Sequence, residues 1–231
     1  MKLEKVGKVN SEIFEYCKDV WDKINQHPFV EAIGNGTLDI EKFKYYIIQD
    51  NLYLLDYAKV FAMGMVKSQS EEDLRSFDKL LRGIIGSEMD AHNEFLASID
   101  LSQDIIENTE ANLITEAYTK YMLGIGTTGG PCQVAAAILA CAWTYLYIGD
   151  HVSKMNGYKD SDFCKHWVDI YTSEDFLQDV IDNTNLVEKL SEGYNQEQID
   201  DLKKIVRNCS EYEYLFWDIC WKQGKLFDHQ I

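Results

Sequence analysis

The chain has 231 residues, of which 46% are hydrophobic, and a formal net charge of −17 from 22 basic and 39 acidic side chains. This length is enough for one sizeable hydrophobic core, so we expect a single domain over residues 1–231. The negative charge repels phosphate groups, which argues against nucleic acid or an anionic membrane surface as a partner.

Apolar residues recur at intervals of three and four along the whole chain, and no run alternates with the period of a strand. This pattern predicts helices over residues 8–24, 40–67, 72–98, 104–124, 131–156, 160–170, 174–190 and 196–225. Asp39, and either Thr172 or Ser173, are candidate N-caps. Glycine-rich segments at 34–37 and 124–130 lack the phosphate-loop pattern and are interpreted as turns between helices. The expected fold class is all-α, a helical bundle.

The cysteine pattern and the N-terminal residues indicate the cellular compartment of the protein. The six cysteines include no close pair such as Cys-x-x-Cys, which favours a reducing cytoplasm over a disulfide framework or a zinc ribbon. The first residues lack the apolar core of a signal peptide, and no stretch approaches about 18 uninterrupted apolar residues. We therefore expect a cytoplasmic protein that does not cross a membrane.

Three polar residues interrupt the apolar sides of these predicted helices. Glu213 is the exception on the apolar side of the last helix, and Asp50 is the only charge on that of the second. Cys141 lies on the apolar side of the helix at 131–156, one turn before Tyr145. Burial of an unpaired carboxylate is costly and raises the carboxyl pKa, so such a group can act as a general acid near neutral pH.

Each of these residues also has an ordinary structural interpretation. A lone buried cysteine usually acts as a small hydrophobic residue, and a buried carboxylate often belongs to a structural pair. Tyrosines at helical spacing are usually core residues with a hydrogen-bonded hydroxyl group. Their combination in one bundle nevertheless favours an aromatic-lined pocket for a flat heteroaromatic ligand. There a cysteine could attack an electron-poor ring carbon while a carboxylic acid delivers the proton.

Four segments carry a resemblance to a known family: HPFVEAIGNGTLDIEKFKYYIIQDNLYLLDYAKV (27–60), SEMDAHNEF (87–95), CAWTYLYIG (141–149) and SEYEYLFWDICW (210–221). In order and spacing they resemble the TenA/thiaminase II family. The resemblance implies a haem-oxygenase-like all-α fold without haem, usually a homotetramer, and a role in thiamine metabolism. Members cleave thiamine, and many hydrolyse the aminomethylpyrimidine left by thiamine breakdown to the hydroxymethylpyrimidine, which is salvaged.

The resemblance also implies the roles of individual residues. Cys141 matches the family's nucleophile, Glu213 its catalytic acid and Asp50 its pyrimidine-binding aspartate. Aromatic pocket positions fall on Tyr53, Tyr118, Tyr145, Tyr171 and Phe216. Ala142 stands where other members can carry a larger residue, which would alter pocket depth and substrate preference. We expect a small-molecule substrate, aminopyrimidine or thiamine, and no cofactor or metal.

Two other functions compete with this interpretation. Some proteins of the same fold are di-iron oxidases, and Glu88 and His92 are spaced to lie on one helix face. A di-iron site needs several more acids and a second histidine, and neither His151 nor His166 repeats the spacing. A non-enzymatic regulator is the other alternative, but the acidic charge and the lack of a helix-turn-helix signature argue against direct DNA contact.

Overall fold

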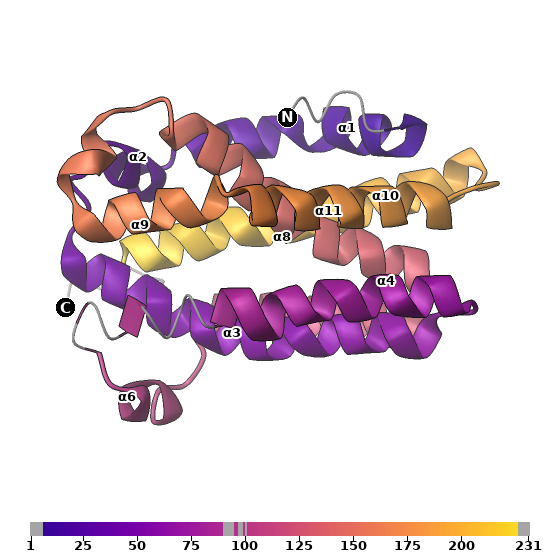
Figure 1. Cartoon of the computed structure of the whole chain (residues 1–231), viewed down its shortest axis with the longest axis horizontal. Coiled ribbons are helices and arrows are strands. Elements are labelled where there is room, and N and C mark those ends of the chain that lie inside the picture. Colours follow the sequence, from indigo (N-terminus) through magenta and orange to yellow (C-terminus); the bar gives the residue numbers. More distant parts are fainter. Residues whose placement is uncertain (1–6, 90–94, 97–98, 100, 226–231) are drawn as a thin grey trace.

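The computed structural model describes residues 7–89, 95–96, 99 and 101–225. Its helices, shown in Figure 1, are α1 (Lys8–Asn25), α2 (Pro28–Gly34), α3 (Ile40–Lys67), α4 (Glu71–Arg82), the π-helical turn η2 (Gly83–Glu88), α6 (Gln103–Glu107), α7 (Leu113–Thr128), α8 (Pro131–Val152), the 3₁₀ turn η3 (Gly157–Asp160), α9 (Asp162–Tyr171), α10 (Glu174–Leu190) and α11 (Gln196–Trp221). No strand occurs in these ranges, so the all-α prediction is confirmed.

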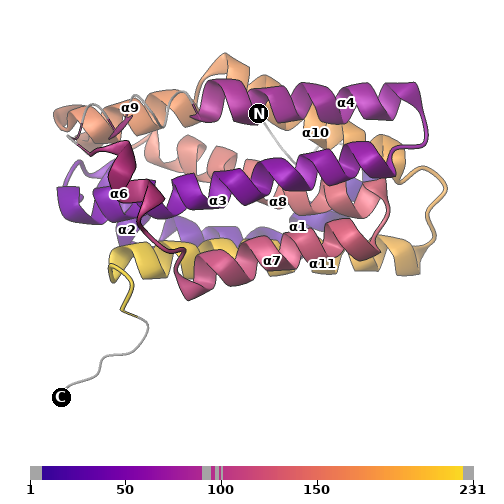
Figure 2. The same cartoon turned by 90° about the horizontal axis from the view of Figure 1, so that it is seen from below.

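The long helices run along the longest direction of the molecule in both views (Figures 1 and 2). Seen from below, α4, α9 and α10 lie along one side, α3 and α8 lie in the middle, and α7 and α11 lie along the other side (Figure 2). Helix α8 packs against α11, α10, α3 and α7. Side chains on α3 and α8 are therefore placed to meet residues from both sides of the bundle.

Helix α8 owes its central position to its composition. Ala135, Ala136, Ala137 and Ala140 are fully buried, and such small side chains let neighbouring helices approach closely. Among the helices of the described ranges, α8 is the one with the length and hydropathy of a membrane span, but 78% of its most apolar window is buried inside the protein. A helix that is apolar all round is equally typical of the core of a bundle.

Local capping explains where several helices begin. The Asp39 carboxylate accepts the backbone N–H of Glu41 at 2.8 Å, which confirms Asp39 as the N-cap of α3. The Ser173 hydroxyl accepts the N–H of Phe176 at 3.1 Å, so Ser173 rather than Thr172 caps α10.

One predicted helix range was wrong, and one helix was not predicted. The single helix expected over residues 104–124 is divided into α6 and α7, because the Asn112 side chain caps α7 by accepting the N–H of Ile114 at 3.0 Å. The Asn112 backbone N–H is held by Gln49 of α3 at 2.8 Å, a contact distant in sequence. The short helix α2 was not predicted, because its seven residues are too few to show a helical period.

The remaining boundaries differ by less. The helix expected over residues 72–98 changes from α-helical to π-helical geometry at Gly83, and part of its C-terminal half lies outside the described residues. Helix α8 ends at Val152 rather than at residue 156, and α11 ends at Trp221 rather than at residue 225.

The start of α1 depends on a side chain from α10. Its N-cap is Gly7, which has no side chain to accept hydrogen bonds. The Glu188 carboxylate replaces a cap by accepting the N–H groups of Val9 at 3.2 Å and Asn10 at 3.1 Å. It also accepts the Asn10 amide at 3.0 Å. An acceptor supplied in this way satisfies the first N–H groups of a helix.

The substitution Glu188→Ala is expected to lower the free energy of unfolding by about 1–3 kcal/mol, because three buried or half-buried donors lose their acceptor. Urea unfolding followed by circular dichroism would measure this change. Glu192→Ala, at an exposed position one turn further along the chain, serves as the control and should change stability little. Equal stability of the two variants would contradict the capping role.

Candidate active site

A cavity of about 360 Å³ lies between α3, α4, α8, α9 and α10. Three of the residues expected in the active site line it: Cys141 and Tyr145 of α8, and Tyr171 of α9. The cavity wall also includes Ala142, the position at which we expected an effect on pocket depth. The remaining expected site residues do not line this cavity; they lie on α3, α7 and α11.

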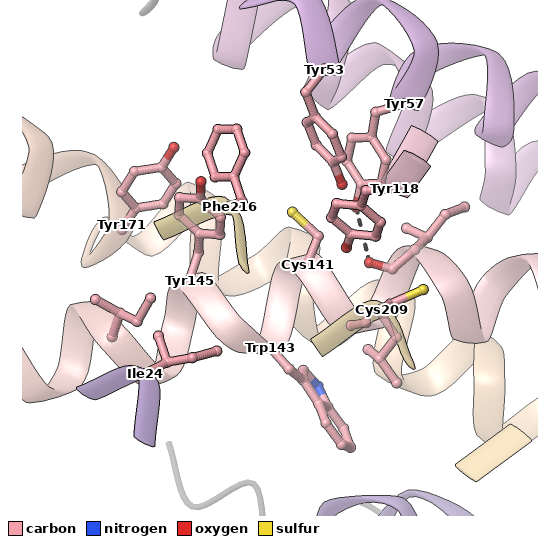
Figure 3. Packing of buried hydrophobic residues seen from close by; sticks show 14 of the residues in the cluster. Ile24, Tyr53, Tyr57, Tyr118, Cys141, Trp143, Tyr145, Tyr171, Cys209 and Phe216 are labelled. Carbon is pink, nitrogen blue, oxygen red and sulfur yellow. Dashed lines mark hydrogen bonds between the residues drawn. The ribbon is translucent and has the colours of Figure 1, made fainter. Parts of the chain in front are cut away.

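Cys141 faces the centre of the bundle. Its sulfur points toward the space between the rings of Tyr53 and Phe216, whereas Trp143 on the same helix points to the opposite side (Figure 3). The thiol is buried, with 7% of the residue exposed.

None of the six cysteines forms a disulfide and all are buried, but their surroundings differ. Cys141 is the cysteine that lines the cavity. Burial raises the pKa of Cys17 and of Cys132 to about 12, and it raises the pKa values of Cys209 and Cys220 well above the ordinary thiol value. Those four thiols are therefore protonated at neutral pH and poor nucleophiles.

Glu213 of α11 is 2% exposed and is held by a tyrosine from α7. The Tyr118 hydroxyl donates a hydrogen bond of 2.9 Å to Oε1 of Glu213. Burial, followed by the Glu213 charge, raises the pKa of Tyr118 well above its ordinary value, so the phenol keeps its proton and remains a donor. The buried carboxyl group thus has a fixed orientation.

Tyr53 of α3 packs against Tyr118, the tyrosine that holds Glu213. Burial is the main cause that raises the Tyr53 pKa, and the charges of Cys141 and Glu213 both add to it. The rings of Tyr53 and Tyr118 are 5.2 Å apart between centroids. The expected nucleophile, on α8, and the expected acid, on α11, therefore both contribute to the raised pKa of Tyr53.

Asp50 is 3% exposed and lies on the buried side of α3, about one turn from Tyr46 and from Tyr53. Burial raises the pKa of Tyr46 and of Tyr145, and in both cases the Asp50 charge is the next cause. The two hydroxyl oxygens are 3.5 Å apart, and the Trp167 indole N–H donates to the Tyr46 hydroxyl at 3.2 Å. The Glu213 charge also adds to the raised pKa of Tyr145.

Aromatic contacts link the residues around Tyr53 to those around Tyr46 and Tyr145. Tyr145 lies 4.6 Å from Tyr171 between ring centroids, and Tyr46 lies 6.0 Å from Phe216. Phe216 in turn lies 6.4 Å from Tyr53. The structure therefore brings all the expected site residues into one aromatic region beside the cavity, although they are far apart in sequence.

Sequence reasoning missed several residues of this region. Trp167 and Trp217 pack within the aromatic group, with Trp217 stacked on Tyr46 at 5.4 Å. Asn183 lines the cavity, and so does His166, which was considered from the sequence only for a metal site. Asn183 had a usable signal, because it is a polar residue on the buried side of α10, the same pattern that drew attention to Glu213.

The residues considered for a metal site are only partly described. The side chain of Glu88 and all of His92 lie outside the described residues. Within those that are described, no group of three or more His, Cys, Asp or Glu side chains is arranged to hold a metal ion. His151 instead lies 3.4 Å from Oε1 of Glu31, between ring Nε2 and the carboxylate.

Comparison with known proteins gives the family. A model of the TENA/THI-4/PQQC family matches residues 16–223. The chain is 39% identical over 214 residues to a Helicobacter pylori protein named aminopyrimidine aminohydrolase, covering 93% of this chain and 99% of that protein. It is 31% identical over 213 residues to a protein of the same name from Halalkalibacterium halodurans, covering 92% and 95%. The chain therefore belongs to the TENA/THI-4/PQQC family.

Solved structures agree with this assignment. A TenA homologue from P. horikoshii OT3 superimposes with a TM-score of 0.85 at 26% identity, covering 94% of this chain and 99% of that one. A protein from Shewanella denitrificans described as having a heme oxygenase-like fold gives a TM-score of 0.77 at 19% identity, covering 96% and 95%. The expected haem-oxygenase-like fold is thus confirmed.

Proposed function

We propose that this protein is an aminopyrimidine aminohydrolase of the thiaminase II type, a hydrolase of thiamine metabolism. It replaces the group on the methylene carbon of an aminopyrimidine by a hydroxyl group from water. Aminomethylpyrimidine and thiamine both carry such a group. Relatives with this activity in their names cover more than nine tenths of the chain. One observation supports the proposal most directly. Cys141, whose thiol lines the cavity, lies in the same tyrosine-rich region as the buried acids Glu213 and Asp50.

In the proposed reaction the Cys141 thiolate forms a bond to an electron-poor carbon of the pyrimidine ring. The carboxylic acid of Glu213 gives its proton to a ring nitrogen. The leaving group then departs from the methylene carbon with its bonding electrons. Water adds to that carbon and returns a proton to Glu213. The carbon–sulfur bond then breaks and the ring nitrogen releases its proton to solvent or to the departed amine, which restores the neutral aromatic ring and the thiolate. The products are the hydroxymethylpyrimidine and the released amine or thiazole.

The other residues bind and orient in this proposal. Asp50 accepts hydrogen bonds from the amino-pyrimidine edge, which a buried carboxylate does strongly. Tyr53, Tyr145, Tyr171 and Phe216 stack against the flat ring. Tyr118 holds Glu213 through the hydrogen bond described above. The proposal further includes a single domain over the whole chain, a homotetramer and a cytoplasmic location, which size-exclusion chromatography with light scattering and cell fractionation would test.

Steady-state turnover of aminomethylpyrimidine and of thiamine, with the hydroxymethylpyrimidine product quantified by chromatography, tests the function. Product must form with the purified protein and without added metal. Absence of product from both substrates would contradict the proposal.

Asp50→Asn is expected to raise KM by about 10- to 100-fold, because a hydrogen bond to a charged acceptor is replaced by a neutral one. The measurement is the same turnover assay over a range of substrate concentrations. Asp56→Asn is the matched control, since Asp56 lies on the same helix but pairs with Lys59 and Lys120 at the surface. An unchanged KM in Asp50→Asn would remove Asp50 from the pyrimidine site.

A further inference from the structure

Tyr212 packs against the tyrosine that holds Glu213. It precedes Glu213 on α11, and its ring is stacked on the ring of Tyr118 from α7, with centroids 5.3 Å apart and an angle of 11° between the ring planes. Adjacent residues of a helix point in different directions, so Tyr212 does not face Glu213 along their own helix. Any effect of the Tyr212 ring on the buried acid is therefore exerted through Tyr118.

A second tyrosine of α7 also contacts the Tyr212 ring. Tyr121 lies one helical turn after Tyr118, and its ring centroid is 5.7 Å from that of Tyr212. The Tyr121 hydroxyl accepts a hydrogen bond of 3.0 Å from the side-chain amide of Asn208, which lies one turn before Tyr212 on α11. These four residues, Tyr118, Tyr121, Asn208 and Tyr212, form an aromatic clasp between α7 and α11.

The clasp restricts the ring that carries the hydrogen-bond donor. Tyr118 packs against Tyr53 of α3, with centroids 5.2 Å apart, and Tyr212 supplies the stacking contact from α11. In this position the Tyr118 hydroxyl donates to Oε1 of Glu213 at 2.9 Å. A hydrogen bond weakens steeply as its length and angle depart from their preferred values, so rotation of the Tyr118 ring would release the carboxyl group.

We propose that Tyr212 is a positioning residue for the proton transfer: its ring fixes Tyr118, and Tyr118 in turn orients the Glu213 carboxyl group. The inference rests on the proposed function, in which Glu213 is the acid. Tyr212 is half-buried and is not one of the described residues that line the cavity. Loss of its ring should therefore lower kcat and leave KM nearly unchanged, because the orientation of the acid changes but the binding residues do not.

The substitution Tyr212→Leu removes the ring and keeps an apolar side chain. We expect it to lower kcat by about tenfold, with KM within about twofold of the wild type, because a catalytic group loses its fixed orientation. Tyr212→Phe keeps the ring that stacks on Tyr118, so its kcat should stay within about twofold of the wild type. Steady-state turnover of aminomethylpyrimidine measures both parameters.

Tyr214→Leu is the matched control, because Tyr212 and Tyr214 flank Glu213 in the sequence. The Tyr214 ring packs edge to face on His27, with centroids 5.4 Å apart, and is 37% exposed. This variant should keep the kcat of the wild type. Equal losses of kcat in Tyr212→Leu and Tyr214→Leu, or equal losses in Tyr212→Leu and Tyr212→Phe, would overturn the positioning role of the ring.

A double-mutant cycle tests whether Tyr212 acts through Tyr118. In the Tyr118→Phe background the hydroxyl group is absent, so Tyr212→Leu has no hydrogen bond left to disturb. There it should lower kcat by less than about twofold, whereas it lowers kcat by about tenfold in the wild-type background. The same fold-loss in both backgrounds would show that Tyr212 acts independently of the Tyr118 hydroxyl group, and would overturn the inference.

Crystal structures of the wild type and of Tyr212→Leu separate this inference from the proposed function. The Tyr118 hydroxyl should move out of hydrogen-bonding distance of Glu213 in the variant. Turnover by the wild type, together with an intact hydrogen bond and unchanged kcat in Tyr212→Leu, would leave the proposed function standing and overturn the inference. A broken hydrogen bond in the variant, without turnover by the wild type, would support the positioning of Tyr118 by Tyr212 and contradict the proposed function.

Discussion

The substitution Cys141→Ser is expected to lower kcat by at least about 10³-fold, because a serine hydroxyl is a far weaker nucleophile than a thiolate. The Kd of hydroxymethylpyrimidine should change little, since serine and cysteine are similar in size and the ring is bound by other residues. Turnover of aminomethylpyrimidine and thiamine gives kcat, and calorimetry gives the Kd.

Cys132→Ser is the matched control for this experiment. Cys132 lies on the same helix and is also buried, and its thiol faces the Val187 carbonyl at 3.9 Å, which a serine hydroxyl can also approach. We expect its kcat to stay within a few-fold of the wild type. Full activity of Cys141→Ser would contradict the covalent mechanism, whereas equal inactivation of both variants would indicate damage to α8 instead.

The substitution Glu213→Gln is expected to lower kcat by about 10²- to 10⁴-fold, the usual contribution of a general acid. Glutamine keeps the shape of the side chain and an oxygen that can accept the Tyr118 hydroxyl, but it cannot transfer a proton at neutral pH. KM should change less than kcat, because the effect lies in the proton transfer rather than in substrate binding.

Glu211→Gln provides the control on the same helix. Glu211 carries the same charge but pairs with Arg207 at the surface, at 3.0 Å. Its kcat should match that of the wild type. The kcat of Tyr118→Phe should lie between those of Glu213→Gln and Glu211→Gln. This variant leaves the Glu213 carboxyl group in place but removes the hydroxyl group that orients it. A Glu213→Gln variant with wild-type kcat would remove Glu213 from the proton-transfer step.

The spacing of apolar residues was enough to predict most of the helices. Helices α1, α3, α8, α10 and α11 start within one or two residues of their expected positions, because each has a long apolar side and several have a local cap. The break at Asn112 was not predictable in the same way, since Gln49, far away in the sequence, binds the backbone there. Local pattern also could not separate α-helical from π-helical geometry at Gly83.

Charged or polar residues on apolar stripes indicated part of the site. Glu213 and Asp50 stand out in the sequence because burial of a carboxylate is unfavourable unless the group is paired or hydrogen-bonded. Asn183 has the same pattern but was passed over, since an amide is a weaker signal than a charge. The resemblance of four segments to a known family connected these residues to one chemistry.

The helical fold class, the family and a short set of candidate residues that includes Cys141, Glu213 and Asp50 could all be predicted from the sequence. These follow from local periodicity, from the cost of burying polar groups and from specific motifs. The packed helices were needed to show that Tyr118 holds Glu213, that Cys141 lines a cavity and that Asn183 and Asp179 line the same cavity. Such relations depend on how helices distant in sequence pack against one another, and one-dimensional spacing carries no information about which faces meet.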